Sequence, residues 1–355
     1  MPDETAGIAT EVASACPICA GPGATLYADL HDFVFGAPGA WRLVRCRDPQ
    51  CGLLWLDPRP TPEDLPKAYT SYYTHSDADV GQLAGRNLAR RLYHAIREAW
   101  WQQRYGYTPG GWKWWRALLA PLAMAHPCGS DAISVEAMFL STRPTPARLL
   151  EIGCGHGYLL QRMQSLGWEV EGVEFDPVCV DLLKKKKITC HLGDLRTQNL
   201  PAASFDAIYT GNVIEHVYDP ISFTKECFRV LRPGGRLVLV TPNSASVGHQ
   251  RFGRDWRGLE PPRHLQIFDL RTLRTAVERC GFGTSVARTT NRGAFYILGM
   301  SAAIRSARSA QATRAANTTS LLSISGLVQQ ILGRLRLLFN PESGEELIVV
   351  AVKPA

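Results

Sequence analysis

The sequence has no apolar run long enough to cross a lipid bilayer. Its longest apolar stretches, such as 117–125 and 237–240, are far shorter than the roughly 20 residues that a membrane-spanning helix needs. The first 15 residues contain no Lys or Arg and carry Asp3, Glu4 and Glu11, which is not the charge pattern of a secretory signal. We therefore expect a cytoplasmic protein without a transmembrane segment.

The chain also lacks a strong charge bias and a disulfide context. It has 355 residues, 45% of them hydrophobic and 20% charged, which is ordinary folded composition and excludes fibrous and wholly disordered classes. The net charge of +7 permits an anionic partner without requiring one. Because the cytosol keeps thiols reduced, we expect the ten cysteines to be thiols or metal ligands.

Turn residues and hydrophobic periodicity divide the chain into three parts: a Cys-bearing module (1–77), a Trp- and Arg-rich helical linker or cap (78–146), and a βα-alternating domain (147–355). The alternation predicts a doubly wound α/β sheet with helices on both faces. A helical insertion is predicted at about 295–341. The β-rich runs are 148–153, 169–175, 188–193, 205–212 and 235–241, followed by a helix at 270–280 and strands at 284–289 and 346–353.

An apolar strand leads directly into the glycine-rich turn Gly153-Cys-Gly-His-Gly157, and a helical pattern follows it. Glycines let a backbone turn tightly and approach a ligand, and the helix N-terminus supplies free amide donors. Glu174 ends the next strand, where a carboxylate accepts hydrogen bonds from the ribose hydroxyls of an adenosine. The dinucleotide fingerprint would need Gly at Tyr158, which disfavours an NAD site.

Five motifs in order resemble class I S-adenosylmethionine-dependent methyltransferases: Glu151-Ile-Gly-Cys-Gly-His-Gly157, Val173-Glu174, Gly193-Asp194, Phe205-Asp206 and Leu231-Arg-Pro-Gly-Gly235. The resemblance covers roughly 147–243 and implies a Rossmann-like, seven-stranded methyltransferase sheet with S-adenosylmethionine as cofactor. The resemblance implies that the glycines hold the methionine part of the cofactor. It also implies that residues at the ends of later strands contact its ribose and adenine and line the methionine pocket. The implied cofactor-binding residues are Glu151, Gly153, Gly155, Gly157, Glu174, Asp194, Leu195 and Asn212.

Three residues are candidates for the chemistry. Glu215 and His216 lie just beyond the fourth strand, at the carboxyl edge where open α/β sheets bind ligands. His264 lies in the loop after the fifth strand, which covers the acceptor pocket in related enzymes. We rank His216 first as general base, while structural roles for both histidines stay open. Other side chains of that loop are predicted to grip an anionic or sugar-like acceptor: Arg254, Asp255, Trp256 and Arg263.

The N-terminal part carries two cysteine knuckles, Cys16-Pro-Ile-Cys19 and Cys46-Arg-Asp-Pro-Gln-Cys51, separated by a predicted hairpin. Four thiolates complete a tetrahedral zinc site with no open position, so the predicted metal is structural. Four unrelated thiols are the alternative. With Asp57-Pro-Arg-Pro60, the segment resembles the N-terminal zinc module of bacterial methyltransferases of sugar and cell-surface polysaccharide biosynthesis. The part after Asn243 is shorter than the C-terminal domain of the sugar C-methyltransferases.

Two stretches combine apolar residues with Arg. Five of the nine Trp lie within 100–115, and no Asp or Glu occurs between Arg279 and Pro341. Such helices either pack on the domain or contact a membrane surface or a lipid-linked substrate. A contact at the inner membrane face is therefore one expectation, and packing is the other.

The predicted function is methyl transfer to a small-molecule acceptor, a sugar nucleotide or cell-surface glycan, at oxygen or carbon. An RNA methyltransferase with a zinc module and a non-catalytic cofactor-binding scaffold are the alternatives. The fourth strand ends Gly211-Asn-Val-Ile214, without the N-P-P-[YF] element that many base-methylating enzymes use, which disfavours a nucleic-acid acceptor.

Overall fold

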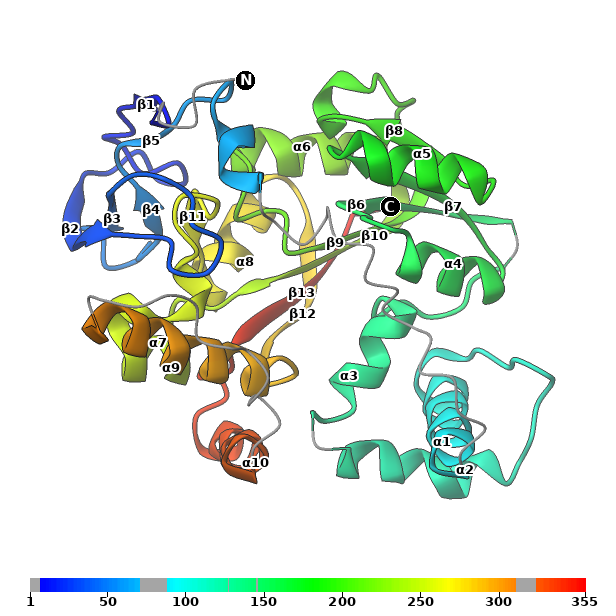
Figure 1. The fold of residues 1–355 in the computed structure, drawn as a ribbon. Helices are drawn as coiled ribbons and strands as arrows, with labels where there is room; N and C mark the ends of the chain where they lie inside the picture. The colour runs from blue at the N-terminus through cyan, green and yellow to red at the C-terminus, as the bar shows by residue number, and fades with distance from the viewer. Residues whose placement is uncertain (1–6, 71–87, 127, 145, 311–323) are drawn as a thin grey trace. The chain divides into compact units, whose positions relative to one another are not determined.

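The computed structural model describes residues 7–70, 88–126, 128–144, 146–310 and 324–355 (Figure 1). The chain forms two compact units, each assembled from separate segments. The first unit comprises Met1–Tyr73, Asn212–Lys225 and Leu239–Val349, and the second comprises Thr74–Gly211, Glu226–Val238 and Val350–Ala355. The three-part division expected from the sequence stays a prediction, and its boundary at 77/78 lies outside the described residues.

Four parallel strands of the second unit carry the glycine turn: β6 (Ala147–Ile152), β7 (Trp168–Glu174), β8 (Thr189–Leu192) and β9 (Phe205–Gly211). β6 pairs with both β7 and β9, and β7 pairs with β8. Helices α4 (Tyr158–Ser165) and α5 (Pro177–Lys185) connect them and pack on β7 and β8. The Asp176 carboxylate caps α5 by accepting from the Val178 N–H at 2.8 Å.

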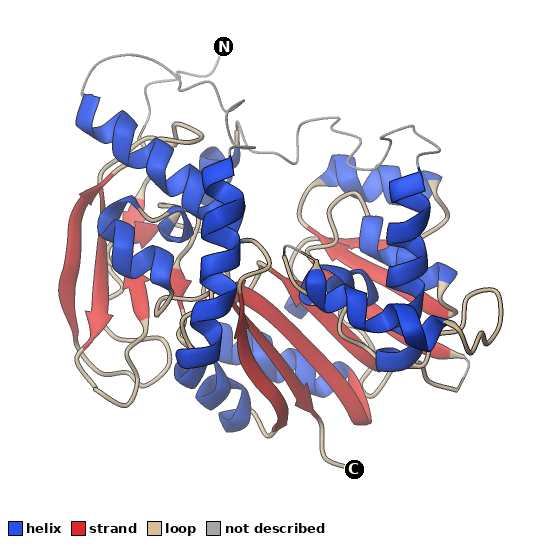
Figure 2. Ribbon diagram, turned by 90° about the horizontal axis from the view of Figure 1, so that it is seen from below, coloured by secondary structure: helices blue, strands red, loops and turns tan. Residues whose placement is uncertain are grey.

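The complete sheet has seven strands in the order β12-β13-β10-β9-β6-β7-β8, with β10 at Leu231–Pro242, β12 at Gly283–Thr290 and β13 at Glu346–Val352. Gly234 N–H donates to Lys353 O, and Asn243 N–H to Glu345 O, so β13 runs antiparallel to β10. The strand order reverses between β6 and β9, where doubly wound sheets bind ligands. Figure 2 shows the strands in red with helices beside them. This confirms the predicted Rossmann-like, doubly wound seven-stranded sheet.

Four helices that lie wholly or partly in the first unit flank these strands in the sequence. Helix α6 (Pro220–Val230) begins in this unit and precedes β10, and α8 (Leu270–Arg279) precedes β12. The predicted insertion contains α9 (Ala294–Ala310) and α10 (Ile324–Phe339), and its part 311–323 lies outside the described residues. β10 begins at Leu231, four residues before the predicted start, because its first residues pair with the end of the chain.

An antiparallel sheet of the first unit joins residues from distant parts of the chain. Its order is β11-β4-β3-β2, with β2 at Gly23–Leu30, β3 at Trp41–Cys46, β4 at Leu54–Leu56 and β11 at Gln266–Ile267. The β2–β3 hairpin confirms the predicted hairpin between the cysteine knuckles. Two-residue strands β1 (Thr10–Glu11) and β5 (Arg59–Pro60) pair separately, and a 3₁₀ turn covers Leu65–Tyr69.

The segment after β10 is ordered, although the sequence predicted only a loop. Helix α7 (Val247–Phe252) begins at Ser246, whose hydroxyl accepts from the His249 N–H at 3.0 Å. Two 3₁₀ turns, Gly253–Asp255 and Arg257–Leu259, lead to β11. The Trp256 side chain between them packs against Leu43, Leu54 and Ile267 in the core of this unit.

The Trp- and Arg-rich segment of the second unit is helical where it is described. α1 (Leu88–Tyr105) packs against α2 (Arg116–Leu119), α3 (Asp131–Ser134) and the 3₁₀ turn Ala120–Ala125. The Glu136 carboxylate, in the turn Val135–Ala137, accepts from Tyr93 and Arg97 of α1. Within the described residues, no helix has the length and apolar character to cross a membrane.

Candidate active site

The glycine turn follows β6 in a conformation that favours glycine. Gly153, Gly155 and Gly157 have φ angles of +73°, +48° and +72°. A Cβ at Gly157 would lie 2.2 Å from Leu183 Cδ2, so the protein itself needs glycine there. A Cβ at Gly155 would meet no described atom within 4 Å. The backbone at Gly155 therefore borders space that the protein does not fill, as a cradle for a ligand requires.

Glu174 at the end of β7 holds this turn in place. Its carboxylate is buried and accepts from the Gly155 N–H at 2.7 Å, the Phe175 N–H at 2.8 Å and the Asp176 N–H at 3.1 Å. A carboxylate has about four acceptor sites, so capacity remains for a ligand hydroxyl. The predicted ribose contact stays a prediction, and the structure adds a second task, fixing the turn.

Glu151 in β6 is a buried carboxyl with an unsatisfied atom. It is 4% exposed, and its Oε2 has no hydrogen-bond partner among the described residues. Burial, together with the charge of Glu174, raises the pKa of Glu151 well above its usual range. A buried oxygen without a hydrogen-bond partner fits a ligand that can donate a hydrogen bond to it. The ammonium group of S-adenosylmethionine is such a donor. The residues present therefore fit this cofactor.

The other predicted cofactor residues lie at the expected strand ends. Asp194 follows β8 and accepts from the Arg196 N–H and guanidinium, each at 2.8 Å. Burial opposes its ionisation, but the bonds from Arg196 outweigh burial and lower the pKa of Asp194. Leu195 is buried, and Asn212 is exposed just after β9 with a φ of +55°. Their cofactor contacts stay predictions.

In the first unit, the three candidates for the chemistry form one group, here called the Glu–His–His cluster: Glu215, His216 and His264. The two imidazole rings are 4.8 Å apart between centroids and nearly perpendicular, at 74°. The backbone N–H groups of Leu265 and Gln266 donate to Glu215 O at 2.8 and 3.2 Å, which fixes the His264 loop beside the segment after β9. The sequence could not show that these histidines meet.

Backbone carbonyls fix the tautomer of both histidines. His216 Nδ1 lies 2.8 Å from Arg263 O, and His264 Nδ1 lies 2.8 Å from Gly258 O. A carbonyl only accepts, so each Nδ1 carries the hydrogen and each Nε2 presents a lone pair. Burial lowers the pKa of His216, and it lowers that of His264 to about 3. Both rings are therefore neutral near pH 7, the form that accepts a proton or binds a metal.

Glu215 is the carboxyl member of the cluster and is fully buried. Thr241 Oγ1 donates to its Oε2 at 2.8 Å, while its Oε1 has no hydrogen-bond partner among the described residues. Burial raises the pKa of Glu215 to about 8. Sequence reasoning did not single out Tyr69, whose hydroxyl lies 3.0 Å from His216 Nδ1.

The loop residues predicted to grip the acceptor have other tasks. Arg263 is fully buried and donates to Glu260 at 3.0 Å, Asp32 at 2.8 Å and Ala68 O at 2.8 Å. Asp255 and Trp256 are also buried, and Arg254 donates to the carbonyls of Ala28 and Asp29. For Asp255, Trp256 and Arg263 that prediction is corrected, because these side chains are buried in the first unit, whereas for the half-buried Arg254 it stays a prediction.

A cavity of about 480 Å³ in the first unit borders the same chain segments as the cluster. Tyr218 and Asp219 line it from the segment that follows His216, and Leu265 and Gln266 line it from the segment that follows His264. Trp55 and Arg59, from the N-terminal part of the chain, also line the cavity. This mixture of aromatic and polar lining is suited to a polar small molecule.

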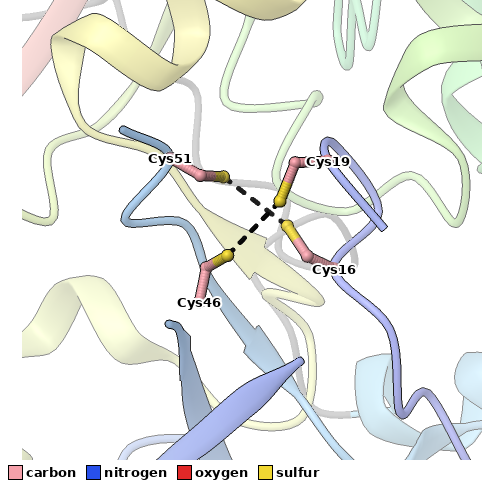
Figure 3. A group of neighbouring side chains, drawn as sticks. All are labelled: Cys16, Cys19, Cys46 and Cys51. Carbon is pink, nitrogen blue, oxygen red and sulfur yellow. Dashed lines mark hydrogen bonds between the residues drawn. The ribbon is translucent and has the colours of Figure 1, made fainter. Parts of the chain in front are cut away.

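The four cysteines of the two knuckles converge, as Figure 3 shows. The Sγ atoms of Cys16 and Cys51 are 3.6 Å apart, and those of Cys19 and Cys46 are 3.4 Å apart. All four Sγ atoms lie within 4.8 Å of one another. Four sulfurs at about 2.3 Å from one zinc ion would be about 3.8 Å apart, so the set fits a tetrahedral ion.

The central region of the chain is similar to known methyltransferases. Residues 131–284 match the family model described as "Methyltransferase domain". Residues of the chain are 34% identical over 138 residues to a probable S-adenosylmethionine-dependent methyltransferase of Mycolicibacterium smegmatis, covering 38% of this chain and 51% of that protein. They are 31% identical over 140 residues to the ubiquinone biosynthesis O-methyltransferase of Xanthomonas axonopodis pv. citri, covering 37% and 56%.

Among solved structures, phosphoethanolamine N-methyltransferase 2 of Haemonchus contortus is similar with a TM-score of 0.47 and 17% identity, covering 85% of this chain and 63% of that one. The chain spans about half the length of the curated relatives it matches. Residues 131–284 are therefore similar to a methyltransferase domain, and the strand order of the sheet is the doubly wound one expected from the sequence.

Proposed function

We propose that this protein transfers a methyl group from S-adenosylmethionine to a small-molecule acceptor. The observation that carries the proposal is the glycine turn, where Gly155 borders unfilled space and Glu151 presents a buried, unpaired oxygen. When bound, the cofactor supplies an electrophilic methyl on a sulfonium. The glycine turn and Glu174 hold it, and the rest of the site has to position the acceptor and handle its proton.

The Glu–His–His cluster is the proposed proton-handling part of the site. Both histidines carry hydrogen on Nδ1, so their Nε2 atoms are the ones that can accept a proton. His216 lies in the segment that follows β9. A hydroxyl or an acidic carbon is an acceptor that needs such groups. The polar lining of the 480 Å³ cavity supports a sugar nucleotide or glycan as acceptor, with O- or C-methylation.

The test is turnover with radiolabelled S-adenosylmethionine against pooled sugar nucleotides, cell-envelope extracts and total RNA. We expect label in the sugar or envelope fractions. Label in RNA alone would replace the small-molecule proposal with the RNA alternative. Cofactor binding by calorimetry without label in any fraction would favour the non-catalytic scaffold.

The cysteine cluster is proposed to hold structural zinc. Its four thiols converge within the distances that a tetrahedral ion requires, and four cysteines leave no open position for chemistry. Two contacts tie it to α8: Thr272 Oγ1 donates to Cys51 O, and Arg279 Nη1 donates to Ile18 O at 2.7 Å. Zinc there would stabilise the first unit.

A peripheral membrane contact is proposed for the second unit. Trp112 and Trp114 are 71% and 74% exposed, and Leu118, Leu122 and Met124 are also exposed. Lys113 is exposed in the same segment, whereas Arg116 is buried and pairs with Glu98. Exposed Trp beside a basic side chain suits the interface of an anionic bilayer, where a lipid-linked glycan acceptor would be found.

A further inference from the structure

We propose that the Glu–His–His cluster binds a divalent transition-metal ion through Glu215 Oε1, His216 Nε2 and His264 Nε2. This inference rests on the proposed function and changes how the cluster would handle the acceptor's proton: the two Nε2 atoms would hold the ion instead of taking the proton, and the ion would make the acceptor acidic. It is distinct from the cysteine site, which shares no residue with it.

Geometry gives the first support. One ligand atom from each of the three side chains lies within 4.8 Å of the other two. Two donors bound to one ion at about 2.1 Å are roughly 3–4 Å apart, so small side-chain rotations close the site. His216 directly follows Glu215, and the bonds from Leu265 and Gln266 to Glu215 O hold His264 beside them.

The atoms behind the ligands give the second support. Metal-binding histidines usually donate the other ring N–H to a carbonyl or carboxylate, which fixes the ring and its tautomer. Here His216 Nδ1 faces Arg263 O and His264 Nδ1 faces Gly258 O, each at 2.8 Å. Thr241 Oγ1 donates to the non-ligating oxygen of Glu215 at 2.8 Å. Every proposed ligand therefore has an outer-shell partner on its other polar atom.

The third support is an unpaired buried atom. Glu215 is fully buried, and its Oε1 has no hydrogen-bond partner among the described residues. A buried polar oxygen without a partner is costly and marks a missing ligand or water. This observation is independent of the histidines and concerns the atom that the ion would bind.

The surrounding charges leave room for a cation. The guanidinium of Arg257 pairs with Glu260, and that of Arg263 pairs with Glu260 and Asp32. These two cations therefore face two carboxylates. Glu260 Oε2 also lies 3.5 Å from His264 Nε2, and two lone-pair atoms facing each other are stabilised by a proton or a metal ion.

The ligand set indicates the kind of ion. Two imidazoles and one carboxylate suit Zn²⁺, Fe²⁺, Co²⁺ or Ni²⁺, whereas Mg²⁺ and Ca²⁺ prefer oxygen ligands. Three protein ligands leave coordination positions open for an acceptor hydroxyl. Glu215, His216 and His264 would hold the ion, and the ion would lower the pKa of an acceptor hydroxyl bound to it.

The test is equilibrium dialysis of the full-length protein against Co²⁺. We expect about two ions per chain, one of them at the cysteine site. Glu215→Gln and the double variant His216→Ala/His264→Ala should each lose about one ion, while the thiolate-to-cobalt absorption of the cysteine site stays. The matched control is His249→Gln, a buried histidine whose ring nitrogens already face Ser244 O and Tyr27 Oη, and it should keep both ions.

The isosteric Glu215→Gln variant keeps the test decisive if the double variant does not fold. One Co²⁺ per wild-type chain, lost only in cysteine variants, would overturn the proposal. Unchanged stoichiometry in folded Glu215→Gln would also overturn it. A failure of the proposed function would have a different result. No acceptor would be methylated, and the number of Co²⁺ ions bound per chain would be unaffected.

Discussion

At the scale of single residues, Gly155 and Gly157 have the same backbone region but different surroundings. A side chain at Gly157 would collide with Leu183, whereas one at Gly155 would enter open space. We expect Gly157→Ala to lower the free energy of unfolding by about 1–3 kcal/mol through overpacking. Chemical denaturation measures this, and an unfolding midpoint equal to wild type would contradict the clash.

Gly155→Val should instead reduce S-adenosylmethionine affinity by at least about tenfold, because the new side chain occupies the ligand's space. Isothermal titration calorimetry measures it. Gly110→Val is the matched control, since Gly110 has a φ of +70° and a Cβ placed there would likewise meet no atom within 4 Å. The Gly110→Val variant has the same backbone strain and should bind S-adenosylmethionine with wild-type affinity. If both variants bound the cofactor equally well, the Gly155 backbone would not belong to the cofactor site.

The two histidines of the Glu–His–His cluster are predicted to differ in how strongly their replacement lowers turnover. Replacing His216 or His264 by Gln should lower turnover by about 10²–10⁴-fold if the acceptor has to lose a proton, with the larger loss at His216. Cofactor affinity, measured in parallel, should stay within a fewfold of wild type. Full turnover in both variants with normal cofactor binding would leave positioning alone as the source of catalysis.

At the scale of elements, the cysteine knuckles flank the β2–β3 hairpin and accept hydrogen bonds from Thr272 and Arg279 of α8. Cys46 ends β3, so its loss should both remove the ion and loosen this hairpin. We expect Cys46→Ser to contain about one zinc ion fewer per chain by elemental analysis and to melt at a lower temperature. A metal-free wild-type protein with the same melting temperature as the zinc-loaded form would refute the structural role.

Helix α9 is joined to the 3₁₀ turn Gly253–Asp255 by ion pairs to Asp255. Bonds from Arg308 and Arg305 to the buried Asp255 carboxylate outweigh its burial and hold its pKa below the usual 3.8. The stability from these ion pairs is therefore complete above about pH 4 and is lost as the pH falls through the folded pKa. Because both arginines are over two-fifths exposed, we expect only about 1 kcal/mol. Asp255→Asn should flatten the dependence of unfolding free energy on pH below about 4, and an unchanged slope would argue against these ion pairs.

At the scale of the whole molecule, the exposed segment from Trp112 to Met124 should govern attachment to membranes. We expect full-length protein to sediment with anionic phospholipid vesicles, and Trp112→Ser/Trp114→Ser to weaken that binding by about tenfold. Phe33→Ser, at another exposed aromatic residue (42% exposed), is the control. Equal binding by the double variant and the control would reassign the segment to packing or to a protein partner.

Much of the fold follows from local sequence. The apolar runs that became β6, β7, β8 and β9 alternate with amphipathic helices, and the predicted bounds agree with the structure within about two residues. The glycine turn, Glu174 and the four cysteines are likewise read from short spacings. β11 could not be predicted, because a two-residue strand has no periodicity and exists only by pairing with β4.

The sequence by itself determined the alternation of strands and helices, the glycine-rich turn after β6 and the two pairs of cysteines, since each depends on residues close together in the chain. The tertiary structure decided the rest of the site. His216 and His264 are 48 positions apart, yet β11 and the bonds to Glu215 O bring their rings to 4.8 Å. It also buried Arg263 beside Glu260 and Asp32, which removed it from the acceptor-binding residues. Burial, tautomer and unpaired atoms depend on which distant segments pack together, and local sequence patterns carry no information about that packing.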